Sequence, residues 1–262
     1  MKKNLTINWI VLTLFSLIMI LPIVVLLIWS VGQRYSWPYI LPEHFTMSWW
    51  INVFSDARFY SSLLNTIIIG AMTSIIGLAM SIPIGKYLSK YNSLKSRLLE
   101  GIMFLPILIS PVVITLGLYK SLSIMGLTGN MFGIIIVHLI PCLPYGIRII
   151  KASYENFDYR YLEQSKFLNA KSYQIRLFVQ IPMMWPSFLA GFHLMFLISM
   201  SQYVLTLFVG NGRVQTLSTQ MYPYLSGGNM SIGAIYSLVF ALVAVSFMLI
   251  LEKILSKRYK RN

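Results

Sequence analysis

Six long runs of apolar residues dominate this sequence and restrict what it can fold into. A helix that crosses the hydrocarbon core of a bilayer needs about 17–25 mostly apolar residues, and each run has about this length. The runs do not alternate apolar and polar residues, as the strands of a membrane barrel do. The runs are Trp9–Val31, Leu64–Gly85, Leu98–Tyr119, Met131–Ile150, Phe188–Val209 and Ile232–Leu251. We therefore predict an all-α polytopic membrane protein with six transmembrane helices.

The charge content agrees with a chain that is solvated largely by lipid. Only 11% of the 262 residues are charged, whereas 57% are hydrophobic. A water-soluble domain has about 25% charged residues, so this chain could not cover a soluble globule of its size. A lipid bilayer is therefore the first partner that the sequence predicts.

The basic residues gather on one side of the predicted membrane. The N-terminus, the second-to-third connection, the fourth-to-fifth connection and the C-terminal tail hold 17 of the 21 Lys and Arg residues. The other side holds Arg34, Arg58, Lys120 and Arg213. Because cytoplasmic loops carry the excess of Lys and Arg, both termini are predicted to be cytoplasmic. The net charge of +14 is then a topology signal, and no nucleic acid partner is needed to explain it.

The external connection between the first two runs is rich in aromatic residues and proline. Its tryptophans and prolines are Trp37, Pro38, Pro42, Trp49 and Trp50. Aromatic residues favour the membrane interface, so this segment is expected to lie along the outer surface. Contact with an external partner is the alternative.

The sequence lacks the usual signs of an energy source or a catalytic centre. No G-x-x-x-x-G-K-[ST] phosphate loop is present, and the fragment Gly85-Lys86-Tyr87 lacks its first glycine and its hydroxyl residue. No run has a carboxylate near its middle, which argues against an ion-coupled carrier. His138 and His193 lie within or near runs without further ligands at short spacing, so we expect neutral histidines that hydrogen-bond between helices, with metal ligation or proton relay as the alternative.

Four polar residues inside the runs are candidates for lining a translocation path: Asn65, Thr66, Ser199 and Gln202. Hydrogen bonds between helices, each worth about 0.6–2 kcal/mol, are the other interpretation of such residues. Prolines also interrupt the third and fourth runs, at Pro106, Pro111, Pro141 and Pro144. Such breaks suit a bundle that moves but are common in membrane helices.

The longest cytoplasmic connection, residues 151–186, is the most informative segment. It mixes three acidic residues with five basic ones, which favours a protein contact surface over a loop that only holds anionic lipid. Phe157, Tyr161, Ser165 and Leu168 recur at helical spacing and predict one packing face.

The second half of this connection predicts a turn and a second short helix. Asn169 is suited to the left-handed conformation that ends a helix. Ser172 is expected to cap a second helix through Val179, which Pro182 and Pro186 would limit. The expected product is a rigid helix–turn–helix beneath the membrane.

These residues resemble a motif of the permease subunits of binding-protein-dependent (type I) ABC importers, E-A-A-x3-G-x9-I-x-L-P. The sequence has Glu163-Gln164-Ser165, three residues, Asn169, nine residues, and then Val179-Gln180-Ile181-Pro182. The spacing is kept, whereas Gln164, Ser165 and Asn169 depart from the motif. Ser62–Thr66 and Gln215–Leu217 also resemble the family, and the closest resemblance is to the spermidine/putrescine class.

The resemblance implies a division of the chain and a set of partners. Residues 1–61 would be a first helix with an external loop, 62–252 the importer core of five helices, and 253–262 a basic cytoplasmic tail. The chain would sit in the inner membrane of a prokaryote with two cytoplasmic ATP-binding subunits, a second permease subunit and an extracytoplasmic solute-binding protein. It would bind no cofactor and would not be an enzyme, because the partner subunit would use the ATP.

The resemblance also assigns residues and a substrate class. The solute would be a polyamine, and an ion-coupled secondary carrier, a channel or a membrane enzyme are the alternatives to an importer. The coupling loop that would seat in the ATPase consists of Glu163, Gln164, Ser165, Phe167, Leu168, Asn169, Val179, Ile181 and Pro182. Within it, Glu163 would be a polar anchor, Phe167 and Leu168 would give apolar seating, and Asn169 would form the turn.

Overall fold

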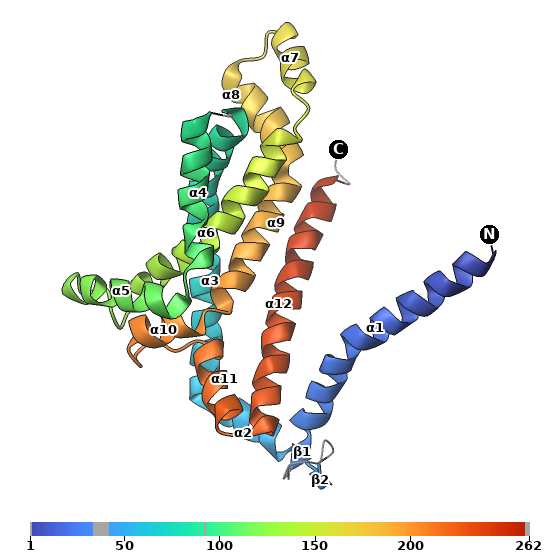
Figure 1. Ribbon diagram of the computed structural model, residues 1–262, viewed down its shortest axis with the longest axis vertical. Helices are drawn as coiled ribbons and strands as arrows, with labels where there is room; N and C mark the ends of the chain where they lie inside the picture. Colours follow the sequence, from blue (N-terminus) through green and yellow to red (C-terminus); the bar gives the residue numbers. More distant parts are fainter. Residues whose placement is uncertain (1, 34–41, 92, 260–262) are drawn as a thin grey trace. The chain divides into compact units, whose positions relative to one another are not determined.

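The computed structural model of the chain describes residues 2–33, 42–91 and 93–259 (Figure 1). The predicted interfacial residues Trp37 and Pro38 lie outside the described residues. The helices are α1 (Lys2–Ser30), α2 (Ser48–Ser55), α3 (Ala57–Lys90), α4 (Leu94–Leu108), α5 (Pro111–Ile124), α6 (Met131–Glu155), α7 (Arg160–Phe167), α8 (Ser172–Ile175), the π-helix η1 (Arg176–Gln180), α9 (Ile181–Met200), α10 (Tyr203–Gly210), α11 (Leu217–Ser226) and α12 (Met230–Tyr259). Two two-residue strands, β1 (Gly32–Gln33) and β2 (His44–Phe45), pair antiparallel with Gly32 opposite Phe45.

The predicted all-α polytopic fold is confirmed. Five helical segments in the described residues are long and apolar enough to cross a membrane. The pair α4 and α5, which bends by 100°, brings the number to six if it is counted as one span. The window in α1 has the highest mean hydropathy, 3.1, and none of it is buried inside the chain, as expected of a helix in lipid.

The third run is interrupted at Pro111, as predicted, whereas α4 continues through Pro106. Helix α4 ends at Leu108, and Ile109 and Ser110 have extended backbone with ψ of 133° and 135°. Proline disfavours helical geometry in the residue before it, so Pro111 explains the extended Ser110. The chain then restarts as α5 with Pro111 in its first turn, where a missing N–H is tolerated.

Two predictions about other spans were wrong. The run Phe188–Val209 is not one helix, because α9 ends at Met200 and Gln202 has ψ of 88° before α10 begins. The fourth run is not interrupted, because α6 continues through Pro141 and Pro144. Proline inside a membrane helix is tolerated where neighbouring groups satisfy the freed carbonyls.

The chain divides into two compact units. The first unit comprises Met1–Ser61 with Thr219–Ala244, and the second comprises Ser62–Ser218 with Val245–Asn262. In the first unit, the Ser231 hydroxyl donates to the Gly32 carbonyl at 2.6 Å, and the rings of Phe59 and Tyr236 meet edge to face. The predicted boundaries at residues 61 and 252 stay a prediction, and residues 260–262 of the predicted tail lie outside the described residues.

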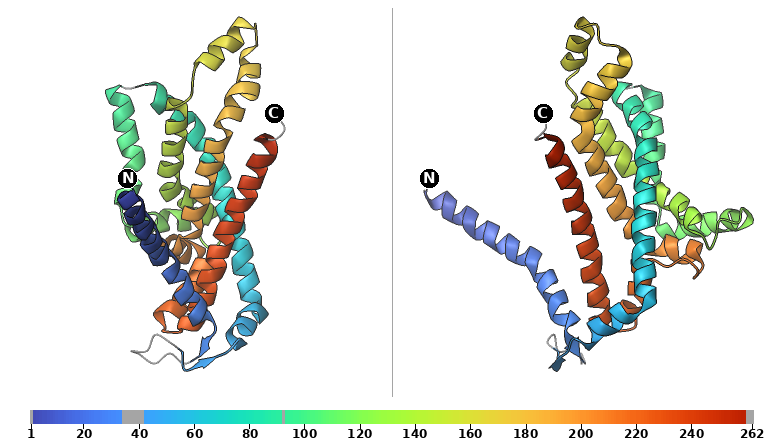
Figure 2. Two further views of the ribbon diagram at one scale, coloured as in Figure 1. Left: turned by 90° about the vertical axis from the view of Figure 1, so that its right-hand side faces the viewer. Right: turned by 180° about the vertical axis from the view of Figure 1, so that it is seen from behind.

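Helix α6 is central to the second unit. It packs along α9 and α4, while α10 packs against α5 and α6 (Figure 2). Gly146 marks the closest approach, because a Cβ there would lie 2.5 Å from the Ser81 hydroxyl of α3 and 2.7 Å from the Met195 sulfur of α9. One apolar cluster joins α6 to α3, α5 and α10, and a second joins α6 to α9.

Candidate functional site

Helix α7 begins with a local charge pair. The Asp158 carboxylate accepts hydrogen bonds from the backbone N–H of Arg160 at 3.0 Å and from its guanidinium at 3.0 Å. These hydrogen bonds lower the pKa of Asp158, because they stabilise the charged carboxylate. An acidic group before the first turn also suits the positive end of the helix dipole.

Helix α7 ends as predicted, with a left-handed asparagine. Asn169 has φ of 55°, and the N–H of Ala170 closes the turn onto the Ser165 carbonyl at 3.1 Å. This is the bonding of a helix C-terminus that reverses the chain. Asparagine tolerates this conformation better than any other residue except glycine.

The predicted packing face of this helix was wrong. Phe157 is buried but precedes α7, whereas Tyr161 and Leu168 on the same predicted face are exposed. Leu162 packs against the cluster formed by α6 and α9 instead. The sequence could not reveal this, because the helix begins at Arg160 and the membrane helices decide which of its faces is covered.

The exposed face of α7 carries two large apolar side chains. Phe167 and Leu168 are 87% and 83% exposed, and Glu163 and Gln164 are exposed beside them. No described residue forms an ion pair or side-chain hydrogen bond with the Glu163 carboxylate. Adjacent large apolar residues on a projecting turn indicate a contact surface, because water is a poor solvent for them.

The second helix of the predicted helix–turn–helix does not stop at Pro182. Residues 172–200 form one helical run of α8, the π-turn η1 and α9. Pro182 lies in the first turn of α9, where its missing N–H is tolerated, and the π-turn before it absorbs the change of register. The helix begins at Ser172, so Lys171 rather than Ser172 occupies the N-cap position, and its N–H donates to the Gln174 side chain at 2.8 Å.

The remaining motif residues hold this helical run in place. Val179 lies within the π-turn, and Ile181 packs against the cluster of α6 and α9 residues that also receives Leu162. The helical run therefore continues without a break from Ser172, four residues after the end of the α7 turn at Leu168, to Met200 in the membrane span.

His138 on α6 bridges the break between α9 and α10. Its Nδ1 lies 2.9 Å from the Ser199 hydroxyl, and its Nε2 lies 2.9 Å from the Thr206 hydroxyl. The ring is 1% exposed. The expected hydrogen bonds between helices are thus confirmed for His138.

The neighbouring hydroxyls fix the tautomer of His138. Thr206 donates its one hydroxyl proton to the Gln202 carbonyl at 2.7 Å, so it can only accept from Nε2–H. In a neutral ring Nδ1 is then the acceptor, and Ser199 is its donor. His138 therefore spans the break at Ser201 and Gln202 between α9 and α10, and no local sequence signal indicated this.

His193 differs from His138. Its ring stacks on Phe247 with 6.3 Å between ring centres, and its Nδ1 has no hydrogen-bond partner within the described chain. The predicted interhelical hydrogen bond is therefore wrong for this residue. Among residues 2–33, 42–91 and 93–259, no group of three or more His, Cys, Asp or Glu side chains could hold a metal ion.

The four candidate path residues form two separate pairs. The Asn65 amide donates to the Gln215 carbonyl at 2.9 Å, and the neighbouring Thr66 hydroxyl accepts from the Leu217 N–H at 2.8 Å. Ser199 binds His138, and its carbonyl accepts from the Gln202 N–H at 3.2 Å. Thr66 and Ser199 are buried, whereas Asn65 and Gln202 are partly exposed, so a path-lining role stays a prediction.

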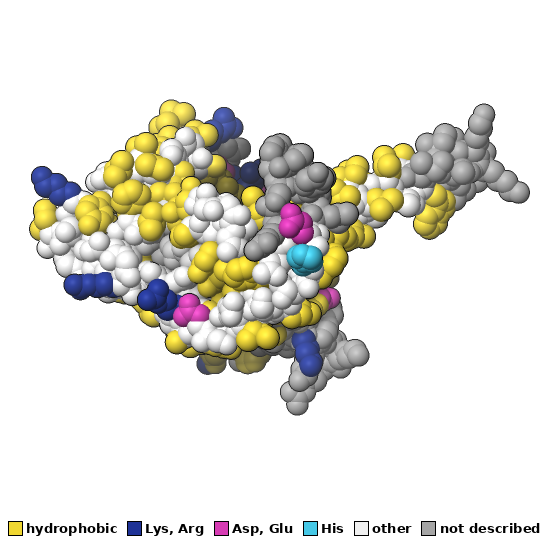
Figure 3. Space-filling view, turned by 90° about the horizontal axis from the view of Figure 1, so that it is seen from below, with side chains coloured by type: hydrophobic (Ala, Val, Ile, Leu, Met, Phe, Trp, Pro, Cys, Tyr) yellow, Lys and Arg dark blue, Asp and Glu magenta, His cyan; other side chains and the backbone are white. Residues whose placement is uncertain are grey.

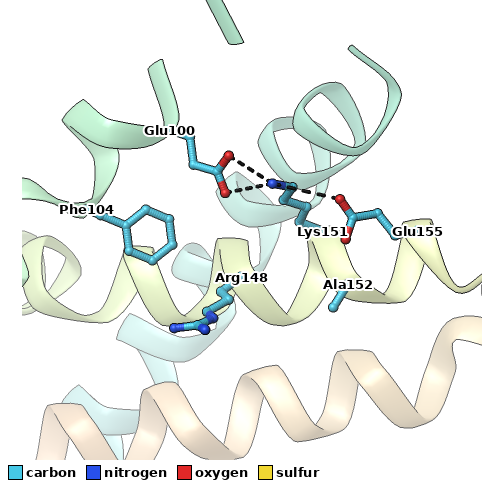
Figure 4. A pocket seen from close by; sticks show the side chains of 6 residues that line it. All are labelled: Glu100, Phe104, Arg148, Lys151, Ala152 and Glu155. Atoms are coloured by element: carbon cyan, nitrogen blue, oxygen red, sulfur yellow. Dashed lines mark hydrogen bonds and ion pairs between the residues drawn. The ribbon is translucent and has the colours of Figure 1, made fainter. Parts of the chain in front are cut away.

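An ion pair joins α4 to α6 near the loop. The Lys151 amine donates to both Glu100 oxygens at 2.7 and 2.8 Å, and Glu155 lies 3.8 Å away one turn further along α6. Figure 4 shows these side chains around a pocket of about 430 Å³ that Phe104 and Arg148 also line. Sequence analysis missed this pair because its partners are 51 positions apart.

Reversing one charge of this pair should destabilise the protein. We expect Glu100→Lys to lower the free energy of unfolding by about 1–3 kcal/mol, between the values for exposed and buried pairs. The double change Glu100→Lys with Lys151→Glu should recover part of that loss, because the carboxylate introduced at position 151 would also lie beside Glu155. Thermal unfolding of the purified chain in detergent measures the stability of both variants. A double variant that is no more stable than the single one would contradict a stabilising ion pair between Glu100 and Lys151.

A family model with the description "binding-protein-dependent transport system inner membrane component" matches residues 77–260. The chain belongs to this family. It is the membrane-spanning permease subunit of an ABC importer, and a multi-pass protein of the bacterial inner membrane. The predicted family is therefore confirmed.

Several relatives and solved structures are similar to this permease. The molybdenum transport system permease protein ModB of Haemophilus influenzae is 25% identical over 77% of this chain and 95% of its own. The spermidine/putrescine transport system permease protein PotC of the same organism is 22% identical over 79% of this chain and 80% of its own. A bacterial ABC transporter that imports alginate has a similar fold, with a TM-score of 0.67, 18% identity and coverage of 98% of this chain and 96% of that chain.

Proposed function

We propose that this permease forms part of a solute translocation path and is driven through the loop of residues 163–182 by a cytoplasmic ATPase. The observation that carries this proposal is the exposed surface of α7, where Phe167 and Leu168 lie uncovered beside Glu163. Burial of a large apolar side chain contributes about 1.5–3 kcal/mol, so these residues would stabilise a complex with an apolar groove.

The packing behind α7 suits the transmission of movement. Leu162 and Ile181 anchor α7 and the start of α9 in one apolar cluster with Tyr154 and Phe157 of the α6 end. A rigid element held between two membrane helices passes a partner's motion to both of them. ATP binding would draw the partner subunits together and turn the permease outward, and hydrolysis would reset it.

The proposed assembly contains two ATP-binding subunits, a second permease subunit and an extracytoplasmic solute-binding protein. One similar structure is an alginate ABC transporter in complex with an alginate pentasaccharide-bound periplasmic protein. Another is the MetNI methionine ABC transporter, with a TM-score of 0.62 and 14% identity. In this proposal ATP is consumed by the partner subunits, and this chain binds no cofactor and has no catalytic role.

The solute is proposed to be a polyamine, from the resemblance to the spermidine/putrescine class. The relatives are named for different solutes, including molybdenum, spermidine/putrescine and 2-aminoethylphosphonate, so their names do not narrow the chemistry. Uptake by vesicles of radiolabelled spermidine, molybdate and a phosphonate, with the cognate binding protein present, tests the substrate class. Uptake of molybdate or the phosphonate without uptake of spermidine would contradict the polyamine proposal.

The energy source separates this proposal from an ion-coupled carrier or a channel. The chain is reconstituted in vesicles with the candidate ATPase and binding protein, and solute uptake is measured with and without internal ATP. We expect uptake to require ATP and to survive an ionophore that collapses ion gradients. Uptake without ATP that follows an imposed ion gradient would instead support a secondary carrier.

A further inference from the structure

A basic pocket lies between the end of α3 and the loop that carries α7. Its volume is about 480 Å³, and its lining includes Lys86 and Lys90 of α3, Lys166 of α7 and Arg176 of η1. No acidic residue of the described part of the chain lines it. None of the four basic side chains forms an ion pair with any residue that the structure describes.

The fold separates charges that are mixed in the sequence. Of the acidic residues in the loop, Glu155 lies against Lys151, and Asp158 bonds Arg160. Glu163 is exposed next to Leu162, the residue through which α7 packs on the membrane helices. The pocket is therefore left with an uncompensated positive charge. Lys90 lies over the Tyr91 ring at 5.1 Å, but this contact leaves its charge in place. Four cations around one cavity repel each other, and an anion in the cavity would relieve that repulsion.

The polar and apolar parts of the pocket suit a phosphate group with an attached organic part. Ser172 and Gln180 add a hydroxyl and a carboxamide to the four basic groups. Leu162 and Ile175 supply apolar surface. Multiple Lys and Arg donors with neutral hydrogen-bonding groups recognise phosphate, whose oxygens are strong acceptors.

The length of α3 places this pocket at the level of lipid headgroups. Helix α3 has 34 residues, which at 1.5 Å each span about 51 Å. A bilayer with its headgroup layers is about 40–45 Å thick, so the last turns of α3 lie in or just outside a headgroup layer. The exposed rings of Tyr87 and Tyr91 lie in these turns with their centroids 4.9 Å apart, as expected for the aromatic belt at a membrane interface.

The exposed apolar side chains of residues 172–180 also indicate a position at the lipid headgroup layer. Tyr173, Leu177 and Phe178 are 57%, 54% and 75% exposed and lie near one another at helical spacing. These apolar groups would face water if the segment were deep in the cytoplasm, but they suit the boundary of headgroups and acyl chains. Figure 1 shows α8 beside the adjoining ends of α3 and α4, with α7 projecting beyond them. Figure 3 shows the opposite end of the molecule, where single Lys and Arg side chains lie among hydrophobic ones.

We propose that this pocket binds the phosphate headgroup of an anionic phospholipid of the inner leaflet, through Lys86, Lys90, Lys166 and Arg176. Basic pockets beside membrane helices on the cytoplasmic side bind anionic headgroups in this way. Because Lys166 belongs to α7, bound lipid would hold the loop against the end of α3. This site is independent of the proposed contact with the ATPase, which uses the exposed face of α7.

Lipid retention by the full-length chain tests the proposal. The chain is purified in neutral detergent and titrated with phosphatidylglycerol or phosphatidylcholine, and bound lipid is counted by native mass spectrometry. The pocket variant is Lys166→Gln with Arg176→Gln. Its matched control is Lys95→Gln with Lys171→Gln, which removes two exposed charges from the same side of the membrane. A third variant, Lys166→Arg with Arg176→Lys, keeps the pocket charge.

We expect phosphatidylglycerol to bind the unmodified chain, the control and the charge-keeping variant with similar affinity. The pocket variant should bind about thirtyfold more weakly, because each basic group near an anionic surface contributes about a fivefold factor. Equal binding by the pocket variant and the unmodified chain, or equal losses in the pocket variant and the control, would overturn the proposal.

Two further arms separate the lipid from other anions. Inorganic phosphate at moderate concentration should leave bound phosphatidylglycerol in place, and displacement by it would assign the pocket to a free anion. Addition of the ATPase subunits should also leave the lipid bound. Loss of the lipid on their addition would show that an acidic protein segment occupies the pocket, which would contradict the lipid assignment.

Discussion

Glu163→Lys should abolish solute uptake while leaving the permease inserted and folded. Glu163 is exposed on α7, and none of its described neighbours forms an ion pair with it, so the substitution removes no contact within the chain. In the proposed complex the carboxylate anchors α7 in the groove of the ATPase. A mismatched charge in a closed interface costs several kcal/mol, so uptake should fall by about a hundredfold or more.

The matched control for this prediction is Glu252→Lys. Glu252 is also exposed and has no described ion-pair partner, and it lies near the cytoplasmic end of α12, so the change in charge is the same. Uptake into vesicles and membrane content are measured for both variants. Full uptake by a well-inserted Glu163→Lys variant would contradict the coupling role of α7.

Gly133→Ala should strongly destabilise the fold at the start of α6. A Cβ on Gly133 would clash with the Leu127 carbonyl oxygen, which is backbone and cannot rotate away. The preceding turn is fixed by Asn130, whose side-chain oxygen accepts from the Gly133 N–H at 2.8 Å and whose amide donates to the Gly126 carbonyl. Overpacking costs about 1–3 kcal/mol and occasionally more, and we expect this position to reach the upper end.

Gly117→Ala is the control for this steric argument. Gly117 lies in α5 with no atom within 4 Å of an added Cβ, and alanine favours helix by up to about 1 kcal/mol. Thermal unfolding in detergent should show a large decrease for Gly133→Ala and no decrease for Gly117→Ala. Equal effects of the two substitutions would contradict the close approach at Gly133.

The sequence predicted features that depend on local chemistry. The long apolar runs predicted the membrane-spanning segments, because a helix of about 20 apolar residues is stable chiefly in the hydrocarbon core of a bilayer. The turn at Asn169 was predicted because few residues tolerate positive φ, and φ there is 55°. The family was predicted because the motif spacing from Glu163 to Pro182 could be compared without any structure.

Features that depend on packing between distant segments could not be predicted. The π-turn η1 lets α8 continue into α9 past Pro182, and nothing in its sequence distinguishes it from a helix end. The covered face of α7 is set by Leu162 against α6 and α9 rather than by the periodicity of α7. The basic pocket needs Lys86 and Lys166, which are far apart in the chain.

Disulfide crosslinking at position 167 tests the central claim most directly. The only cysteine of the chain, Cys142, is fully buried, so it should not form crosslinks itself. Phe167→Cys therefore introduces the one accessible thiol. Phe132→Cys, at an exposed phenylalanine of α6, is the control. The chain is expressed with the ATPase encoded beside it, which carries a cysteine in its groove. We expect co-elution and a crosslink from position 167 alone, whereas a chain that elutes without the ATPase and still moves solute into ATP-free vesicles would contradict the account.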